Sequence, residues 1–242
     1  RTTAKKDGDS YVLRGSKAFI SGGSASDIYV VMARTGAQQD GPRGVSCFVV
    51  EAKDCAGLSF GAQEKKLGWN SQPTCAVIFD DVRVPAANRL GKEGEGFKIA
   101  MKGLDGGRVS IATCSVGAAK ACYDLARDHV KKREQFGKPL AANQSVQFRL
   151  ADMGLKIHTS RLLVRHAAAL LDAKDPNATV HCAMAKKGAT EACWDVCDQA
   201  LQLFGGYGYL NDYPVERFLR DARVHRILEG TNEVQDIIMA RA

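Results

Sequence analysis

The segment Arg226-Ile227-Leu228-Glu229-Gly230-Thr231-Asn232-Glu233-Val234 predicts a turn that leads into a short helix. Asn232 carries a side chain suited to a helix N-cap, and Gln235 stands three residues later, where it would close a capping box. The helix would bury an apolar face formed by Val234, Ile237 and Ile238. Glu229 is therefore expected in a turn beside apolar side chains.

Two opposed influences would act on Glu229 in this turn. Burial would raise its pKa, whereas the N-terminus of the following helix would lower it. A carboxylate in such surroundings suits a general base. The alternative is that Glu229 caps the helix or pairs with Arg226, and the local sequence alone favours that alternative. The rest of the chain reverses this preference.

Upstream of this segment, apolar residues recur at spacings of three and four along three long stretches, which is typical of the inner faces of amphipathic helices. The stripes are Val109, Ala112, Val116, Ala119, Tyr123, Ala126 and Val130; Val146, Leu150, Met153, Ile157, Ser160, Val164, Ala167 and Leu171; and Ala185, Ala189, Ala192, Val196, Ala200 and Leu203. Breaks fall at 137–139, 175–177 and 205–206. With the helix after Thr231, the stretches predict a four-helix bundle.

Residues 10–85 instead predict short β-strands separated by turns, as in a barrel or sandwich. Tyr11–Leu13 and Lys17–Ser21 would flank a turn at Arg14-Gly15-Ser16, and Ile28–Met32 is apolar enough for a strand buried on both faces. Further strands are expected at 45–50, 74–79 and 82–84, and Leu90–Gly96 would be a flexible link. The fold class is therefore α+β, with a strand domain followed by a helical domain.

Composition narrows the class of protein. The 242 residues are 45% hydrophobic and 25% charged, which is ordinary for a soluble globular protein, and no apolar run reaches the roughly 18 residues of a membrane span. The eight cysteines form no Cys-x-x-Cys pair, so free thiols are expected and no metal site is indicated. The net charge of +7 comes from scattered Lys and Arg, which favours a phosphorylated small molecule over nucleic acid. Because the chain does not begin with Met, we expect it to be part of a longer protein.

Three further motifs are weak alone, because each also fits a β-turn, a helix end or a glycine C-cap. They are Phe19-Ile20-Ser21-Gly22-Gly23, Arg133-Glu134-Gln135-Phe136-Gly137 and Gln202-Leu203-Phe204-Gly205-Gly206-Tyr207-Gly208-Tyr209. Together with the Glu229 segment, and in this order, they resemble the acyl-CoA dehydrogenase family over essentially the whole chain. The resemblance implies an antiparallel β-barrel middle domain at 1–88, incomplete at its N-terminus. A C-terminal four-helix-bundle domain would follow at 89–242, and the N-terminal helical domain of the family would lie outside this sequence.

The resemblance also implies the roles of individual residues. Glu229 would be the catalytic base. FAD would be bound by Phe19, Ile20 and Ser21 at the flavin ring, by Arg133 at the pyrophosphate, and by Asn143, Gln144, Thr231, Asn232 and Glu233 nearby. A neighbouring subunit would contribute Gln202, Leu203, Phe204, Gly205 and Gly206 to the adenosine side. The acyl-CoA substrate would face Asp105, Gly106, Gly107, Arg108 and Arg241.

The segments Gly68–Thr74 and Leu104–Arg108 look most like the branch of the family that acts on isobutyryl-CoA. This implies α,β-dehydrogenation of a short branched acyl-CoA, with electrons passed to electron transfer flavoprotein by a homotetramer. The compartment would be the mitochondrial matrix or a bacterial cytoplasm. No protein side chain accepts hydride, so a cofactor is required, and no Gly-x-Gly-x-x-Gly motif indicates a nicotinamide. Two alternatives remain: an oxidase that passes electrons to oxygen, and a non-catalytic subunit or assembly factor that retains the fold.

Overall fold

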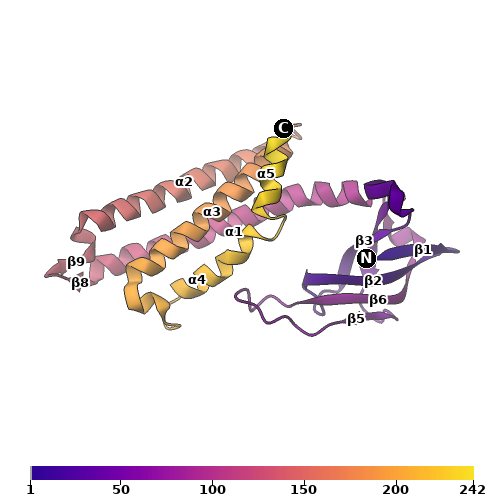
Figure 1. The fold of residues 1–242 in the computed structure, drawn as a ribbon, viewed down its shortest axis with the longest axis horizontal. Helices are drawn as coiled ribbons and strands as arrows, with labels where there is room; N and C mark the ends of the chain where they lie inside the picture. The colour runs from indigo at the N-terminus through magenta and orange to yellow at the C-terminus, as the bar shows by residue number, and fades with distance from the viewer. Residues whose placement is uncertain (1) are drawn as a thin grey trace. The chain divides into compact units, whose positions relative to one another are not determined.

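The computed structural model describes residues 2–242 and has mixed α and β structure (Figure 1). The chain divides into two compact units, one ending at Gly103 and the other spanning Leu104–Ala242. The first unit contains the sheet, and the second contains most of the helical residues. The predicted order of a strand region followed by a helical region is confirmed.

Seven strands form one sheet in the order β5-β6-β2-β1-β3-β4-β7. Their bounds are β1 Thr3–Asp7, β2 Ser10–Ser21, β3 Ile28–Arg34, β4 Val45–Glu51, β5 Leu58–Phe60, β6 Thr74–Pro85 and β7 Arg89–Leu90. All neighbours are antiparallel except β1 and β3, which are parallel. Within residues 2–242, β5 and β7 stand at opposite ends of this order and do not pair, so the sheet is open and no closed barrel is found.

The predicted turn at Arg14-Gly15-Ser16 is wrong, because β2 continues through it as one strand of 12 residues. The partner strand β6 is equally long and also runs unbroken, although two strands were expected there. Their register slips between Leu13 and Gly15, and a second slip lies between Lys17 and Ile20. These slips behave as β-bulges, which absorb extra residues while pairing continues on both sides.

Strand β3 buries one face only, which corrects the expectation of a strand buried on both faces. Tyr29, Val31 and Ala33 are buried, whereas Ile28 and Val30 are 57% and 59% exposed. The buried face belongs to the core of this unit, where the rings of Tyr11 and Phe48 lie 4.9 Å apart. A continuous apolar sequence therefore did not distinguish a half-buried strand from a fully buried one.

Three long helices share one core, with two short helices near the C-terminus (Figure 1). Their bounds are α1 Gly96–Lys132, α2 Gln144–Asp172, α3 Ala178–Phe204, α4 Val215–Ala222 and α5 Asn232–Ala240. The helices α2 and α3 lie wholly in the second unit, whereas α1 begins at the end of the first. The hairpin of β8 Glu134–Gln135 and β9 Lys138–Pro139 connects α1 to α2. The predicted stripes supply most of the helical core, but α4 was not predicted, so the expected count of four helices is wrong.

Helix α5 contradicts its predicted orientation. Its N-cap is Thr231 rather than Asn232, and its buried residues are Asn232 and Gln235. Val234 and Ile237, expected in the core, are 40% and 47% exposed. The reason is tertiary, because Asn232 on α5 makes buried hydrogen bonds to Lys186 and Thr190 on α3.

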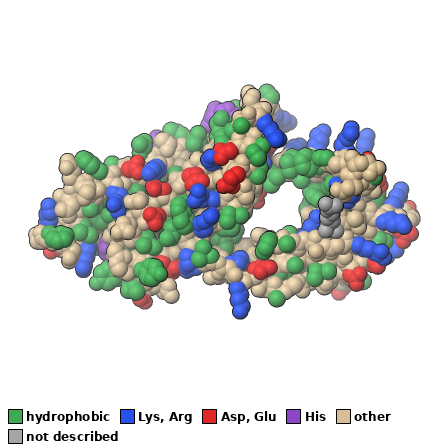
Figure 2. Space-filling view, in the orientation of Figure 1, with side chains coloured by type: hydrophobic (Ala, Val, Ile, Leu, Met, Phe, Trp, Pro, Cys, Tyr) green, Lys and Arg blue, Asp and Glu red, His purple; other side chains and the backbone are tan. Residues whose placement is uncertain are grey.

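On the face drawn in Figure 2, Lys and Arg side chains are spread over both units and interspersed with Asp and Glu. This distribution matches the scattered basic residues of the sequence. In the part of the chain that the structure describes, no helix is both long enough and apolar enough to cross a membrane.

Candidate active site and cofactor pocket

Glu229 lies in the turn between the short 3-10 helix Arg223–Arg226 and α5. Its φ is 56°, and that of Gly230 is 84°, so both residues adopt left-handed backbone conformations. Glycine accepts this conformation freely, whereas a glutamate does so at a cost of order 1–3 kcal/mol. The position of Glu229 is therefore imposed by its surroundings.

The carboxylate of Glu229 lies against the bare backbone of Gly107 on α1. A Cβ built on Gly107 would be 2.8 Å from Glu229 Cδ and nearer still to its Oε2, so a side chain at 107 would displace the carboxylate. Glu229 is half-buried, and no ion pair to it is recorded among residues 2–242. Arg226 pairs instead with Glu191 at 2.9 Å, so the alternative of a Glu229–Arg226 pair is wrong.

A fully buried lysine, Lys186 on α3, holds the backbone directly after Glu229. Its Nζ donates hydrogen bonds to the carbonyl of Gly230 at 2.9 Å and to Oδ1 of Asn232 at 2.8 Å. Burial lowers the pKa of Lys186 to about 8, against the opposing effect of the carboxylates of Glu191, Glu229 and Glu233. Lys186 was missed by sequence reasoning, although it precedes Thr190 and Cys193 by four and seven residues on the buried face of α3.

The buried amide of Asn232 connects this lysine to the ion pair between Arg226 and Glu191. Its Nδ2 donates to Glu191 Oε1 at 2.7 Å and to Thr190 Oγ1 at 3.1 Å. Gln235, also fully buried, donates to the Gly230 carbonyl at 2.9 Å, so that carbonyl accepts two hydrogen bonds. Buried polar contacts therefore hold the turn in place.

The residues predicted to bind the substrate lie in different environments, some buried and some exposed. Asp105 and Arg108 form an ion pair of 2.7 Å with side chains only 15% and 5% exposed, and Thr179 donates to Asp105 at 2.7 Å. A Cβ on Gly106 would meet no atom within 4 Å, so this residue borders open space. Arg241 is exposed at the C-terminal end of α5, where it is the C-cap.

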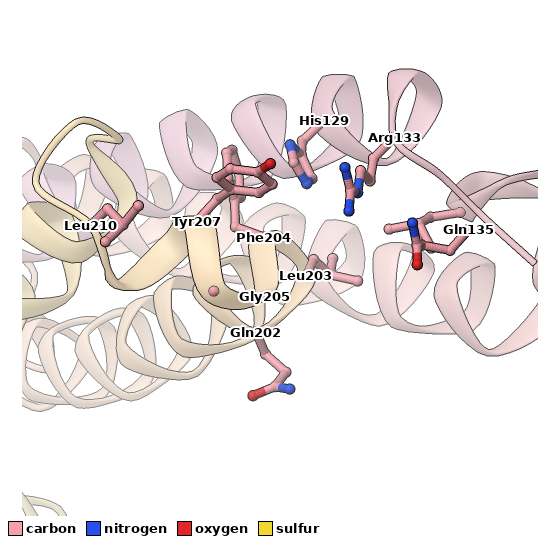
Figure 3. A pocket seen from close by; sticks show the side chains of 11 residues that line it. His129, Arg133, Gln135, Gln202, Leu203, Phe204, Gly205, Tyr207 and Leu210 are labelled. Atoms are coloured by element: carbon pink, nitrogen blue, oxygen red, sulfur yellow. The ribbon is translucent and has the colours of Figure 1, made fainter.

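A pocket of about 440 Å³ lies between the end of α1 and the end of α3 (Figure 3). It brings together Arg133 and all five residues of the predicted Gln202–Gly206 motif. The ring of His129 stacks on Phe204 with centroids 4.1 Å apart, and the guanidinium of Arg133 lies over the Tyr207 ring at 5.5 Å. Figure 3 shows His129 and Arg133 on the α1 side of this pocket, with Phe204 and Tyr207 facing them.

The chemistry of the pocket, with stacked rings beside a guanidinium, suits an anionic aromatic ligand. No acidic partner of Arg133 is recorded within the described residues, so its charge is free to meet a pyrophosphate. Cβ atoms on Gly205 and Gly206 would meet no atom within 4 Å, which leaves their backbone accessible. Burial, and then the charge of Arg133, hold the pKa of His129 below its usual value, which favours the neutral imidazole.

The sequence models of two protein domains match this chain. The acyl-CoA dehydrogenase middle domain matches residues 1–82, and the acyl-CoA dehydrogenase C-terminal domain matches residues 94–242. The chain belongs to the acyl-CoA dehydrogenase family.

Curated and solved members of the family are similar along the whole chain. A mitochondrial isobutyryl-CoA dehydrogenase of Dictyostelium discoideum is 61% identical over 99% of this chain and 57% of its own length. Butyryl-CoA dehydrogenase from Megasphaera elsdenii has a TM-score of 0.97 and 45% identity, over 100% of this chain and 62% of that one. A chain in the structure of the electron transferring flavoprotein of Acidaminococcus fermentans has a TM-score of 0.96 and 46% identity, over 100% and 63%. The chain thus spans about three fifths of the length of these relatives.

In this acyl-CoA dehydrogenase family member, the remaining residues that the sequence predicted to bind the cofactor occupy three places. Phe19, Ile20 and Ser21 end β2 beside its second bulge, where Phe19 has a φ of 55° and is 74% exposed. Asn143 precedes α2 and donates to the carbonyl of Leu140, a pocket residue, and Gln144 is exposed at the start of α2.

The third place is the start of α5, where Thr231, Asn232 and Glu233 differ in burial. Glu233 is exposed, and hydrogen bonds from its own backbone amide and from Thr231 lower its pKa. Asn232 is 4% exposed, and its amide group is hydrogen-bonded to α3. Of these three side chains, Glu233 is the one left open to solvent.

Four pocket residues besides Leu140 were absent from the predicted set: His129, Gln135, Tyr207 and Leu210. His129 could have been found from its spacing, because it stands four residues before Arg133, which follows the last residue of α1 and donates a backbone hydrogen bond to the carbonyl of His129. Tyr207 could have been found because it belongs to the glycine motif itself.

Proposed function

We propose that the full-length protein catalyses FAD-dependent α,β-dehydrogenation of a short branched acyl-CoA, isobutyryl-CoA first. The observation that carries this proposal is the Glu229 carboxylate, half-buried, unpaired among the described residues, and held against Gly107. A base for an unactivated C–H bond needs such an available carboxylate in a partly dry site. The 61% identity to an isobutyryl-CoA dehydrogenase supports the choice of substrate.

In this reaction Glu229 takes the α-proton as the α C–H bond breaks, and the β-hydrogen leaves with its electron pair while the C=C bond forms. FAD, when bound, supplies the acceptor for that hydride, which no side chain can provide. The negative charge that develops on the thioester oxygen needs fixed hydrogen-bond donors, and a backbone N–H beside Glu229 is suited to this role. The acyl thioester is oriented by the residues around Asp105–Arg108.

The same proposal assigns the FAD contacts. Phe19, Ile20 and Ser21 contact the flavin, and Arg133 with the Gln202–Gly206 motif receives the adenosine diphosphate part bound by a neighbouring subunit. Asn143, Gln144 and the residues 231–233 complete the site. The open pocket supports this assignment, with a guanidinium that stacks on Tyr207 and has no acidic partner among residues 2–242.

We further propose a domain boundary at residues 88/89 and a homotetramer. Phe148, Leu155 and Leu162 recur every seven residues on α2 and are 64%, 62% and 54% exposed, which suits a helix-to-helix contact between subunits. In the whole protein, the open sheet would form part of a barrel and the helices part of a bundle. Electrons pass to an electron transfer flavoprotein, in line with the similar chain in that structure, and a eukaryotic source would place the enzyme in the mitochondrial matrix.

The Glu229→Gln variant of the full-length protein tests the proposed base. The amide keeps the shape of the side chain but cannot take a proton, so flavin reduction by isobutyryl-CoA should slow by about 10²–10⁴-fold. Rapid mixing with detection of flavin bleaching measures this rate. Bleaching within a few-fold of the wild-type rate would remove Glu229 from the mechanism and the proposal with it.

The substrate assignment predicts a preference for small α-branched acyl chains. The open space at Gly106 supports this preference, and the 61% identity to an isobutyryl-CoA dehydrogenase supports it more strongly. Comparison of kcat/KM for isobutyryl-, 2-methylbutyryl-, butyryl- and octanoyl-CoA tests it. A preference for octanoyl-CoA would contradict the assignment, and hydrogen peroxide formed with each turnover would indicate an oxidase.

A further inference from the structure

Lys186 is unusual among the charged side chains of this protein because its exposed fraction is 0%. A buried ammonium group costs free energy that an apolar residue of similar size would not, so burial alone gives no reason to have lysine here. Its two recorded partners are the carbonyl of Gly230 and the amide oxygen of Asn232. Both belong to the segment that follows Glu229 directly.

The segment on the other side of Glu229 is tied to the same part of α3. Arg226, three residues before Glu229, pairs with Glu191, and the same Glu191 accepts a hydrogen bond from Asn232. The stretch 186–191 of α3 thus holds the chain at residue 226 and again at residues 230–232. Glu229 lies between these two attachments, with a left-handed backbone and its carboxylate against Gly107.

We propose that Lys186 is a positioning residue for Glu229, fixing the 229–230 turn so that the carboxylate stays against Gly107. The inference rests on the proposed role of Glu229 as the base. Lys186 contacts the turn through the Gly230 carbonyl and acts only through the position of Glu229. Without its ammonium group, that carbonyl keeps Gln235 as a donor but Asn232 Oδ1 loses its strongest contact. The turn is then free to relax from its left-handed geometry.

The Lys186→Met variant of the full-length holoenzyme measures this effect, because methionine fills the same volume without a donor. A displacement of the base by about 1 Å should slow flavin reduction by up to about 10²-fold at saturating isobutyryl-CoA. The substrate concentration at half-maximal rate and the FAD content should stay within about threefold of the wild-type values, because Lys186 does not line the Arg133 pocket and because Asn232 keeps its hydrogen bonds to Thr190 and Glu191. Loss of FAD or weaker substrate binding with an unchanged limiting rate would overturn the proposal.

Lys187→Met is the matched control. Lys187 is the next residue on α3, and it also contacts α5, through an ion pair with Asp236 on the solvent side. Removing this ion pair weakens the α3–α5 contact without touching the turn. Because a surface ion pair contributes little, flavin reduction should remain within about twofold of the wild-type rate. An equal loss in Lys186→Met and Lys187→Met would mean that Lys186 serves helix packing alone.

A double-mutant cycle with Glu229→Gln separates positioning from general stabilisation. If Lys186 acts through Glu229, the Lys186→Met change should slow flavin reduction no further once Glu229 is Gln. An undiminished fold-change in the Glu229→Gln background would overturn the positioning role and leave the proposed function intact. A Glu229→Gln variant that bleaches at the wild-type rate would instead overturn the proposed function.

If Lys186→Met is not recovered as folded holoenzyme, Glu191→Gln replaces it in the double-mutant cycle with Glu229→Gln. This change keeps the shape of the side chain and its acceptor for Asn232 but weakens the charge pairing with Arg226. We expect a smaller loss of flavin reduction, about threefold to tenfold, which disappears in the Glu229→Gln background. A loss that persists there would overturn the proposal as well.

Discussion

The Glu229 turn and the Arg133 pocket belong to the same helical unit but are built in opposite ways. The turn is held by side chains with almost no exposure, such as Lys186, Gln235 and Asn232. The pocket is open, and aromatic rings and a guanidinium without an acidic partner among the described residues line it. The turn holds the Glu229 carboxylate in place, whereas the pocket leaves the Arg133 guanidinium and the aromatic rings accessible to a ligand.

The difference follows from what each region has to do. A base must be held within a fraction of an ångström of its proton, which requires a rigid supporting shell. A cofactor pocket gains affinity from contacts made on binding, so accessible glycine backbone and stacked rings are useful there. The comparison predicts that substitutions at the turn alter the rate of flavin reduction, whereas substitutions at the pocket alter FAD retention.

Among the changes that test this comparison without altering Glu229 itself, Gly107→Ala should have the largest effect. The new Cβ would occupy the place of the Glu229 carboxylate, so flavin reduction should fall by about 10²-fold while FAD content is unchanged. Rapid mixing with isobutyryl-CoA and the flavin-to-protein absorbance ratio measure the two quantities.

Gly117→Ala on the same helix is the control, because its added Cβ would meet no atom within 4 Å. Both changes gain about 1 kcal/mol of helix propensity, so only the contact with Glu229 distinguishes them. A Gly107→Ala variant as fast as Gly117→Ala would contradict the contact.

Arg133→Ala should have the opposite pattern. Loss of a charge-assisted contact to the pyrophosphate should weaken FAD retention by roughly 10- to 100-fold, with the helical circular dichroism signal intact. FAD content after gel filtration at low protein concentration measures it. Lys132→Ala removes the same charge one residue away, from a side chain that does not line the pocket, and should retain FAD. Full flavin occupancy in Arg133→Ala would show that the pocket holds no pyrophosphate.

The smallest expected effect is on stability as a function of pH. Burial lowers the pKa of Lys186 from 10.5 to about 8, so between these values the unfolded chain binds more protons at this site than the folded chain. Stability therefore rises with pH across that interval. The carboxylates of Glu191, Glu229 and Glu233 oppose the shift, and Arg108 adds to it.

Urea unfolding of the wild type and of Lys186→Met at pH 7.5 and pH 9.5 tests this prediction. The wild type should gain free energy of unfolding relative to the variant at the higher pH. If the wild type and the variant differ in free energy of unfolding by the same amount at both pH values, the ammonium group is not desolvated by its burial.

Periodicity predicted the long helices and most of their buried residues. Ala112, Val130, Ala185 and Val196 are fully buried because apolar spacing along a helix fixes which side chains share one face. The same argument failed for α5, which is nine residues long and buries Asn232 and Gln235 in place of its apolar residues. Short helices are oriented by the contacts that dock them, and those contacts lie far away in sequence.

The strands show the same limit. Apolar runs located β3, β4 and β6, but not the single-sided burial of β3 or the continuation of β2 through Gly15. Exposure of a strand face depends on what packs over the sheet, and a bulge depends on the register with the partner strand. Neither quantity is contained in the local sequence.

By itself, the sequence determined the α+β organisation, the long helices, the family and the turn that carries Glu229. It did so because helical spacing, glycine positions and ordered motifs are local properties. Only the tertiary structure decided that Arg226 pairs with Glu191, that Gly107 makes room for the carboxylate and that Lys186 is buried beneath the turn. Those contacts join α1, α3 and the turn before α5 across more than 30 positions of sequence, and hydrogen bonds of that range exist only once the helices have packed.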